Sequence, residues 1–168
     1  WFYFKSNGKK RLNDDTSKEI FEKKINGKHY AFDYRGVMTY TWTLKATANA
    51  TTASNWLYFS DPEDGARQTK GWFKVVAAEY LNYEKYNDDE DAWYYADGNG
   101  KLYAGEFKTI KGKKYAFRDD GRMINGLKFI KDNGTGLSVI ADDDENGHDF
   151  DTEDGFDAHA PEMEVMGY

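Results

Sequence analysis

A twelve-residue phrase occurs twice in this chain and constrains its fold more than any other feature. The stretch "GKKYAFRDDGRM", residues 112–123, repeats "GKHYAFDYRGVM", residues 27–38, with the same residue at seven of the twelve positions. Typical residue frequencies are too low for such agreement to arise by chance. A chain that repeats a short phrase is built from similar units, each of which buries its apolar face against its neighbour.

The repeated unit is an aromatic tetrad followed by a turn that contains glycine. Five versions are present: "WFYFKSNG", "HYAFDYRG", "WLYFSDPEDG", "WYYADGNG" and "KYAFRDDG". Alternating side chains before a Gly, Asn or Asp turn indicate a β-strand that enters a hairpin, and we expect a short second strand after the turn, as in "RMING". One hairpin is not stable alone. The pattern therefore predicts an all-β solenoid of stacked β-hairpin repeats with irregular insertions over residues 1–130, followed by a non-repeat acidic C-terminal segment over residues 131–168.

One face of the predicted strands forms the expected core, and the insertions carry the helical signals. The core set is Phe2, Phe4, Tyr30, Phe32, Leu57, Phe59, Tyr94, Tyr115 and Phe117. Thr16 and Glu19 have the spacing of a capping box, which indicates a helical turn. The insertion "KVVAAEYLNYEKYNDDED", residues 74–91, is the better helix candidate.

Composition excludes several classes of function. The net charge is −7, and nucleic acids and anionic membranes both require clustered Lys and Arg. Cysteine is absent, so the chain has no disulfide framework and no thiol nucleophile. No apolar run is long enough for membrane insertion. The chain opens on "WFYF", inside a repeat unit, and we expect it to be a fragment or processed form of a longer protein.

The repeats resemble a known family. "KGWF" with Gly71 and Trp72, "AWYYADGNG" with Trp93, and "GRMINGL" ending at Leu127 are similar to the cell-wall-binding repeats of Gram-positive surface proteins. These are often called choline-binding repeats and have relatives in glucan-binding proteins and clostridial toxins. The resemblance implies a noncatalytic module that anchors a secreted or surface protein to the bacterial cell wall. It also implies a cage of three aromatic side chains for choline, because a quaternary ammonium is attracted to ring faces.

The resemblance also points to candidate ligand-binding residues. The first tetrad position holds Trp1, His29, Trp56, Trp93 and Lys114, and the Gly-Trp position holds Phe21, Trp42, Trp72, Phe107 and Leu127. Lys114 and His29 each remove an aromatic wall, whereas Trp42, Trp56 and Trp93 supply all three. The predicted ligand-binding residues are Trp42, Trp56, Trp72, Trp93, Tyr58 and Tyr95. Because the cages are incomplete elsewhere, we expect a cell-wall polymer or glycan in preference to choline. The alternative is a structural or protein-interaction spacer whose aromatic residues are all core.

The acidic C-terminal segment contains a pattern typical of calcium loops. In "DDDENGHDFDTE", the ligands would be Asp142, Asp144, Asn146 and Glu153. Asp149 stands where such loops carry an apolar residue, and "GTGLSVIA" is too short for the entering helix. The favoured interpretation is a solvated acidic segment without a cofactor, and calcium binding is the alternative. No nucleophile motif, P-loop or HExxH sequence is present, so we expect no catalytic residues.

Overall fold

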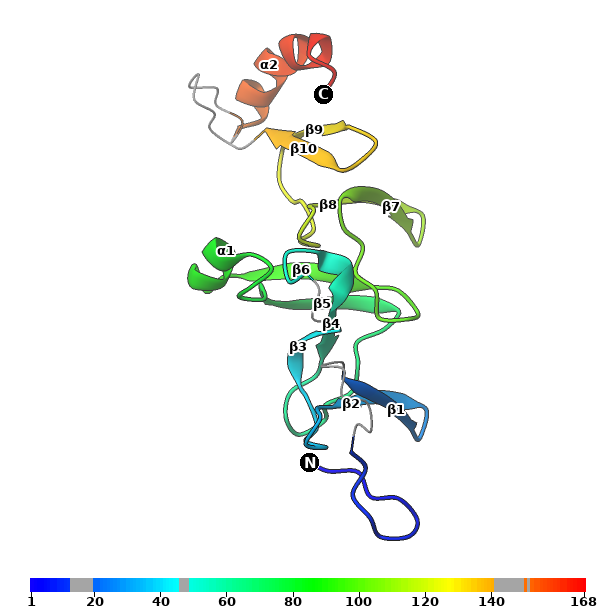
Figure 1. Ribbon diagram of the computed structural model, residues 1–168. Helices are drawn as coiled ribbons and strands as arrows, with labels where there is room; N and C mark the ends of the chain where they lie inside the picture. Colours follow the sequence, from blue (N-terminus) through cyan, green and yellow to red (C-terminus); the bar gives the residue numbers. More distant parts are fainter. Residues whose placement is uncertain (13–19, 46–48, 141–149, 151) are drawn as a thin grey trace. The chain divides into compact units, whose positions relative to one another are not determined.

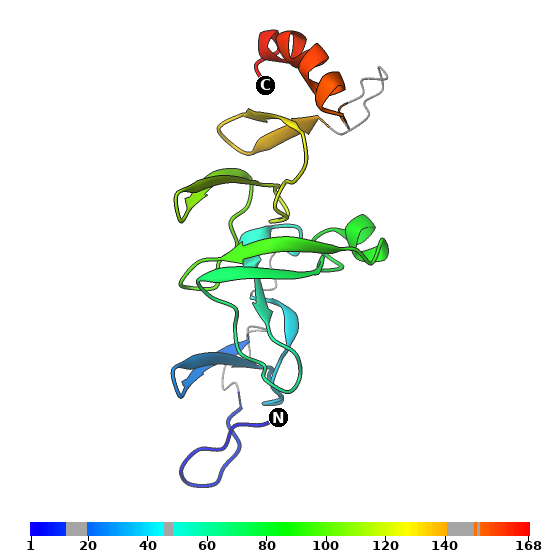
Figure 2. The ribbon, with the colours of Figure 1, turned by 180° about the vertical axis from the view of Figure 1, so that it is seen from behind.

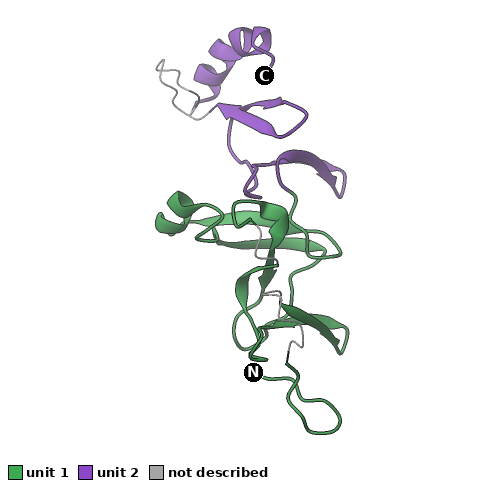
Figure 3. Ribbon diagram, in the orientation of Figure 1, with its two compact units in different colours: residues 1–103 green, residues 104–168 purple. Residues whose placement is uncertain are grey.

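The computed structural model describes residues 1–12, 20–45, 49–140, 150 and 152–168. The chain divides into two compact units, Trp1–Tyr103 and Ala104–Tyr168 (Figure 3).

Two-stranded antiparallel hairpins are the building blocks of both units (Figures 1 and 2). The first unit contains β1 (Phe21–Ile25) paired with β2 (Lys28–Phe32), β3 (Thr41–Leu44) with β4 (Trp56–Phe59), and β5 (Gly71–Val76) with β6 (Asp91–Ala96). The second contains β7 (Glu106–Ile110) paired with β8 (Lys113–Phe117), and β9 (Phe129–Asp132) with β10 (Leu137–Ile140). The other elements are a 3₁₀ turn (Ala53–Asn55) and the helices α1 (Tyr83–Asn87) and α2 (Glu153–Val165).

Four tetrads form strands, namely β2, β4, β6 and β8, and each pairs with the strand before it. The expected pairing with a strand after the turn is therefore wrong. After the turn only one bridge remains, as between Phe32 and Met38 and between Phe117 and Met123. The turn itself explains this. Asp33 Oδ1 accepts hydrogen bonds from the backbone N–H groups of Arg35 and Val37, both at 2.9 Å. A side chain that takes up backbone donors holds the turn and ends the ladder of strand hydrogen bonds.

The two copies of the repeated phrase begin at the same kind of turn. Asn26 and Gly27 have φ values of 49° and 85°, and Lys111 and Gly112 have 49° and 80°. Positive φ at both central residues defines the type I′ turn, which matches the twist of the flanking strands and favours glycine. The glycine that opens each phrase is thus the second residue of a tight hairpin turn, between β1 and β2 and between β7 and β8.

The predicted core is confirmed at the regular strands and wrong at the first tetrad. The buried members are Phe32, Leu57, Phe59, Tyr94 and Phe117, whereas Tyr30 and Tyr115 are half-buried. Phe2 and Phe4 are exposed. Their tetrad forms only a bridge from Phe4 to Lys10, so it has no partner strand to place it over a core.

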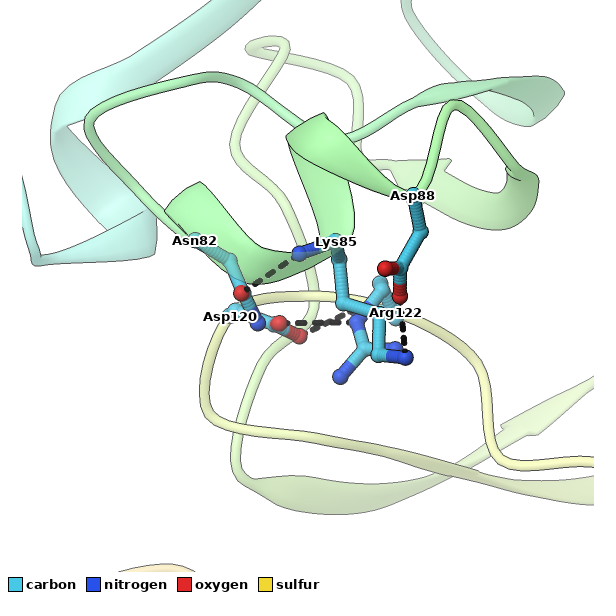
Figure 4. Close-up of polar contacts among 5 residues, drawn as sticks. All are labelled: Asn82, Lys85, Asp88, Asp120 and Arg122. Atoms are coloured by element: carbon cyan, nitrogen blue, oxygen red, sulfur yellow. Dashed lines mark hydrogen bonds and ion pairs between the residues drawn. The ribbon is translucent and has the colours of Figure 1, made fainter.

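The insertion between β5 and β6 forms the helix that the sequence predicts, although only over Tyr83–Asn87. The Asn82 side chain caps α1 by accepting a hydrogen bond from the Lys85 backbone N–H at 3.1 Å (Figure 4). The Lys85 ammonium also contacts Asp88 at 2.6 Å.

Figure 4 also shows the Asp120–Arg122 ion pair of the second unit, at 2.7 Å, in the turn that follows β8. The helical turn expected at Thr16 and Glu19 lies outside the described residues.

The C-terminal unit contains more structure than a solvated acidic segment. β9 spans the boundary predicted at residue 130, and α2 contributes Met163 to a buried cluster with Phe129 and Phe150. Phe156 of α2 stacks on Phe129 with a centroid distance of 3.9 Å. The favoured interpretation of a solvated acidic segment is therefore not confirmed, because apolar residues spaced along α2 bury themselves against the last hairpin. The boundary at residue 130 itself stays a prediction.

The calcium loop is described only at its end. Asp142, Asp144 and Asn146 lie outside the described residues. Glu153 is the first residue of α2, directly after the cap Thr152, whose hydroxyl accepts from the Gly155 N–H at 3.1 Å. In the described part of the chain, no cluster of three or more His, Asp or Glu side chains is arranged to hold a metal ion. No helix in that part is long and apolar enough to cross a membrane.

A pair of glycine substitutions separates backbone strain from steric collision in these turns. Gly36 has φ +75°, and a Cβ there would collide with the carbonyl oxygen of Arg11. Gly27 has φ +85°, and a Cβ there would meet no atom within 4 Å. We expect Gly27→Ala to lower the free energy of unfolding by about 1 kcal/mol, and Gly36→Ala by about 2–3 kcal/mol, because overpacking is added to strain. Urea denaturation measures both, and equal losses would contradict the close packing at Gly36.

Candidate functional site

Three aromatic rings from β3 and β4 form the first triad, which comprises Trp42, Trp56 and Tyr58. Trp42 lies opposite Tyr58 in the strand register, and Trp56 is two residues from Tyr58, so all three side chains share one face. The Trp42 ring meets Trp56 at a centroid distance of 6.5 Å and an angle of 88°, and Tyr58 at 5.1 Å and 75°. Edge-to-face contacts of this kind are favourable beyond the area that they bury.

The same arrangement recurs in the next hairpin as the second triad, which comprises Trp72, Trp93 and Tyr95. Trp72 lies opposite Tyr95, and it meets Trp93 at 6.3 Å and 89° and Tyr95 at 5.2 Å and 80°. Two hairpins that differ in sequence and in insertion therefore build the same three-ring corner.

The first triad is closed by the protein around it. Trp56 is 5% exposed, and its indole Nε1–H donates to the Ala50 carbonyl at 2.7 Å. The Trp42 Nε1–H donates to the Val76 carbonyl at 2.8 Å. Tyr58 stacks on Phe73 at 5.0 Å, and burial raises the pKa of its phenol, with a further contribution from nearby carboxylates. These contacts on every member indicate that the first triad holds the hairpins together.

The second triad is open. Trp93 is 43% exposed, although it makes the same edge-on contact as the buried Trp56. Tyr95 is extended by Tyr103, whose ring is parallel at 8° with a centroid distance of 5.2 Å. An exposed tryptophan beside further half-buried rings is the kind of surface that marks an interaction site.

The other two tetrad hairpins, β1–β2 and β7–β8, lack this corner, and their strand register corrects one expected position. Phe107 lies opposite Ala116, as Trp72 lies opposite Tyr95, but in the other copy the residue opposite Ala31 is Glu22. Phe21, expected at the Gly-Trp position, is one residue away and faces Phe32. A shift of one residue moves a side chain to the other face of a strand. The Gly-Trp position of this hairpin thus carries a carboxylate.

The structure distributes all six predicted ligand-binding residues between the two triads. Trp42, Trp56 and Tyr58 form the first, and Trp72, Trp93 and Tyr95 form the second. Trp93 contacts Trp72. The expected grouping of Trp93 with Trp42 and Trp56 stays a prediction, and so does the binding of a ligand by any of the six residues. Tyr103, which stacks on Tyr95, lies outside the set predicted from the sequence. Its signal is an aromatic residue directly after a glycine turn, outside the tetrads.

Comparison with known proteins places this fold. No protein-family profile matches the chain. Choline binding protein F from Streptococcus pneumoniae, in its crystal form II, is similar with a TM-score of 0.50 and 21% identity, over 82% of this chain and 38% of that chain. The same protein crystallised in the presence of a peptidoglycan analogue, a tetrasaccharide-pentapeptide, gives 0.50 and 21%, over 89% of this chain and 41% of that chain.

A sequence relative matches a shorter stretch. Glucosyltransferase-S of Streptococcus mutans serotype c is 46% identical over 48 residues, which is 29% of this chain and 3% of that enzyme. The chain thus spans well under half of choline binding protein F and a small part of the glucosyltransferase. Its hairpins have the fold of choline binding protein F, and the predicted hairpin-repeat fold is confirmed.

Proposed function

We propose that this chain is a noncatalytic binding module for a bacterial cell-wall or surface polysaccharide, and that it acts outside the cell as part of a secreted or surface protein. The observation that carries the proposal is the second triad, which repeats the geometry of the first triad but leaves Trp93 accessible, whereas Trp56 at the same position is buried. Aromatic faces bind sugar rings by stacking, and the repeated hairpins provide a second, closed triad that keeps the open one in place.

Choline is the second candidate ligand, and the angle between the rings favours it. Trp72 and Trp93 are perpendicular, so two ring faces meet at a corner. A quaternary ammonium gains from contact with several ring faces at once and donates no hydrogen bonds. The similarity to choline binding protein F supports the same candidate at the level of the fold. A structural spacer remains the alternative to both ligands, and it predicts no dependence of wall binding on Trp93.

Substitution of Trp93 tests the proposal. We expect Trp93→Ala to weaken binding to purified Gram-positive cell walls about tenfold or more, because the ring supplies a main contact surface. Its free energy of unfolding should fall by less than about 1.5 kcal/mol, because the side chain is already 43% exposed. Co-sedimentation with the walls measures binding, and competition by free choline or by wall oligosaccharides distinguishes the two ligands.

Tyr34→Ala is the matched control, because Tyr34 is an exposed aromatic residue, at 70%, outside both triads. Wall binding should be unchanged in this variant. If Trp93→Ala binds walls as the unmodified protein does, the triad is not the binding site and the spacer interpretation prevails.

A further inference from the structure

The two copies of the repeated phrase replace the aromatic corner by the same small residue. In the triads, the third tetrad position is Tyr58 or Tyr95, opposite Trp42 or Trp72. In the phrase copies the third position is Ala31, opposite Glu22, and Ala116, opposite Phe107. We call these two hairpins, β1–β2 and β7–β8, the alanine hairpins. A methyl group in place of a phenol ring leaves space, and close-packed proteins fill such space.

A lysine of the chain lies on the ring of the second alanine hairpin. Lys114, at the first tetrad position, places its Nζ 4.4 Å from the centre of the Phe107 ring. This distance is well within the range of a cation–π contact. A cation of the chain therefore covers the ring that corresponds to Trp72 of the open triad.

An arginine engages the corresponding residue of the first alanine hairpin. Arg67 forms an ion pair through Nη1 with Oε2 of Glu22, and its side chain is only 10% exposed. The Arg67 backbone N–H also donates to the His29 carbonyl at 2.8 Å, which holds the residue beside this hairpin. His29, at the first tetrad position, places Nδ1 3.8 Å from the same carboxylate oxygen.

Arg67 comes from the neighbouring repeat, at a position that holds Lys10, Met38, Leu102 and Met123 in the others. Arg67 forms the bridge to Phe59, just as Met38 bridges Phe32 and Met123 bridges Phe117. The cation therefore has no counterpart in those two repeats, and it coincides with a carboxylate at the position of Trp42 and Trp72. Beside it lies a cavity of about 280 Å³ whose lining includes His29, Ser60 and Gln68.

We propose that Arg67 and Lys114 are built-in occupants of the alanine hairpins. Each places a cation of the chain on the side chain that an external ligand would contact, and so closes its hairpin to that ligand. Ligand specificity is then set by the third tetrad position: tyrosine builds an aromatic corner, and alanine admits a cation of the chain. The existence of an external ligand rests on the proposed function, whereas the occupancy by these two cations can be tested without any wall polymer.

Chemical rescue tests the occupant of the first alanine hairpin. Arg67→Ala leaves the half-buried Glu22 carboxylate without its cation, so we expect its Tm to fall by about 5–15 °C. Guanidinium chloride at low, non-denaturing concentration should recover part of this loss relative to equal sodium chloride, because guanidinium re-enters the vacated place. The unmodified protein and Glu22→Gln/Arg67→Ala should show no recovery. An equal response of all three proteins would overturn the proposal for Arg67.

Lys114→Gln provides an independent test that does not depend on a destabilised variant, because Lys114 is exposed. The probe is tetramethylammonium, followed by NMR at the Ala116 methyl group and the Phe107 ring. We expect saturable shifts in Lys114→Gln and none in the unmodified protein. Identical behaviour of the two proteins, whether both shift or neither does, would overturn the proposal for Lys114.

Wall co-sedimentation of Trp93→Ala, compared with these two cation tests, separates this inference from the proposed function. If Trp93→Ala retains wall binding while guanidinium still rescues Arg67→Ala, the proposed function fails and the occupancy stands. If wall binding depends on Trp93 but neither cation test succeeds, only the occupancy fails.

Discussion

Replacement of Trp42 by alanine is expected to lower the free energy of unfolding by about 3–5 kcal/mol, because a large, half-buried ring that packs against several other aromatic rings is lost and its cavity collapses only in part. The ring contacts Tyr94 at 5.0 Å and Phe73 at 5.9 Å in addition to the other members of the first triad. Its indole N–H also satisfies the Val76 carbonyl, which belongs to the next hairpin. Urea unfolding followed by circular dichroism measures the loss.

Trp42→Phe is the matched control for this prediction. Phenylalanine keeps an aromatic ring in the same place but loses the hydrogen bond to Val76, so we expect a smaller loss of about 1–2 kcal/mol. A loss below 1 kcal/mol for Trp42→Ala would contradict the structural role assigned to the first triad.

In the C-terminal unit, the largest effect is expected from Phe150→Ala. Phe150 is fully buried and meets Phe129 edge-on at 5.1 Å, so we expect a loss of about 3–5 kcal/mol in the stability of this unit. Hydrogen exchange should accelerate in α2 and in β9–β10, because both contribute to the same cluster.

Val165→Ala is the control for Phe150→Ala, because Val165 is 89% exposed at the end of α2. Its exchange rates should match those of the unmodified protein. If Phe150→Ala leaves the exchange of α2 unchanged, α2 does not depend on this cluster.

The tetrads were predictable because their information is local. Alternation along "WLYF" and "WYYA" places the first and third residues on one face, whereas Trp42 and Trp72 were identified through the resemblance to the wall-binding repeats. The alternation also identified the core residues Leu57 and Tyr94 on the other face. The strand that pairs with a tetrad was not fixed in this way, because pairing depends on contacts between segments. The choice of the wrong partner strand follows from that difference.

Three other errors have physical causes in particular residues. Trp72 is marked by the glycine before it, but neither Phe21 nor Glu22 follows a glycine. The aromatic Phe21 was therefore assigned to the Gly-Trp position, which Glu22 occupies one residue later. The last hairpin was missed because "FIKD" and "LSVI" contain no aromatic tetrad. Helix α2 was missed because Gly155 and Pro161 disfavour a helix, and its burial of Phe156 and Met163 is a tertiary effect.

The residues between the strands differ greatly from one hairpin to the next, while the strand register is retained. Lys111 and Gly112 alone join β7 to β8, whereas residues 77–90, with α1, join β5 to β6. The entropic cost of closing a flexible loop grows only slowly with its length, so the tips of these hairpins tolerate added sequence. A foreign peptide grafted at Lys111–Gly112 would be displayed on the same kind of hairpin as the one that carries α1, which makes the hairpin tips suitable for presenting epitopes.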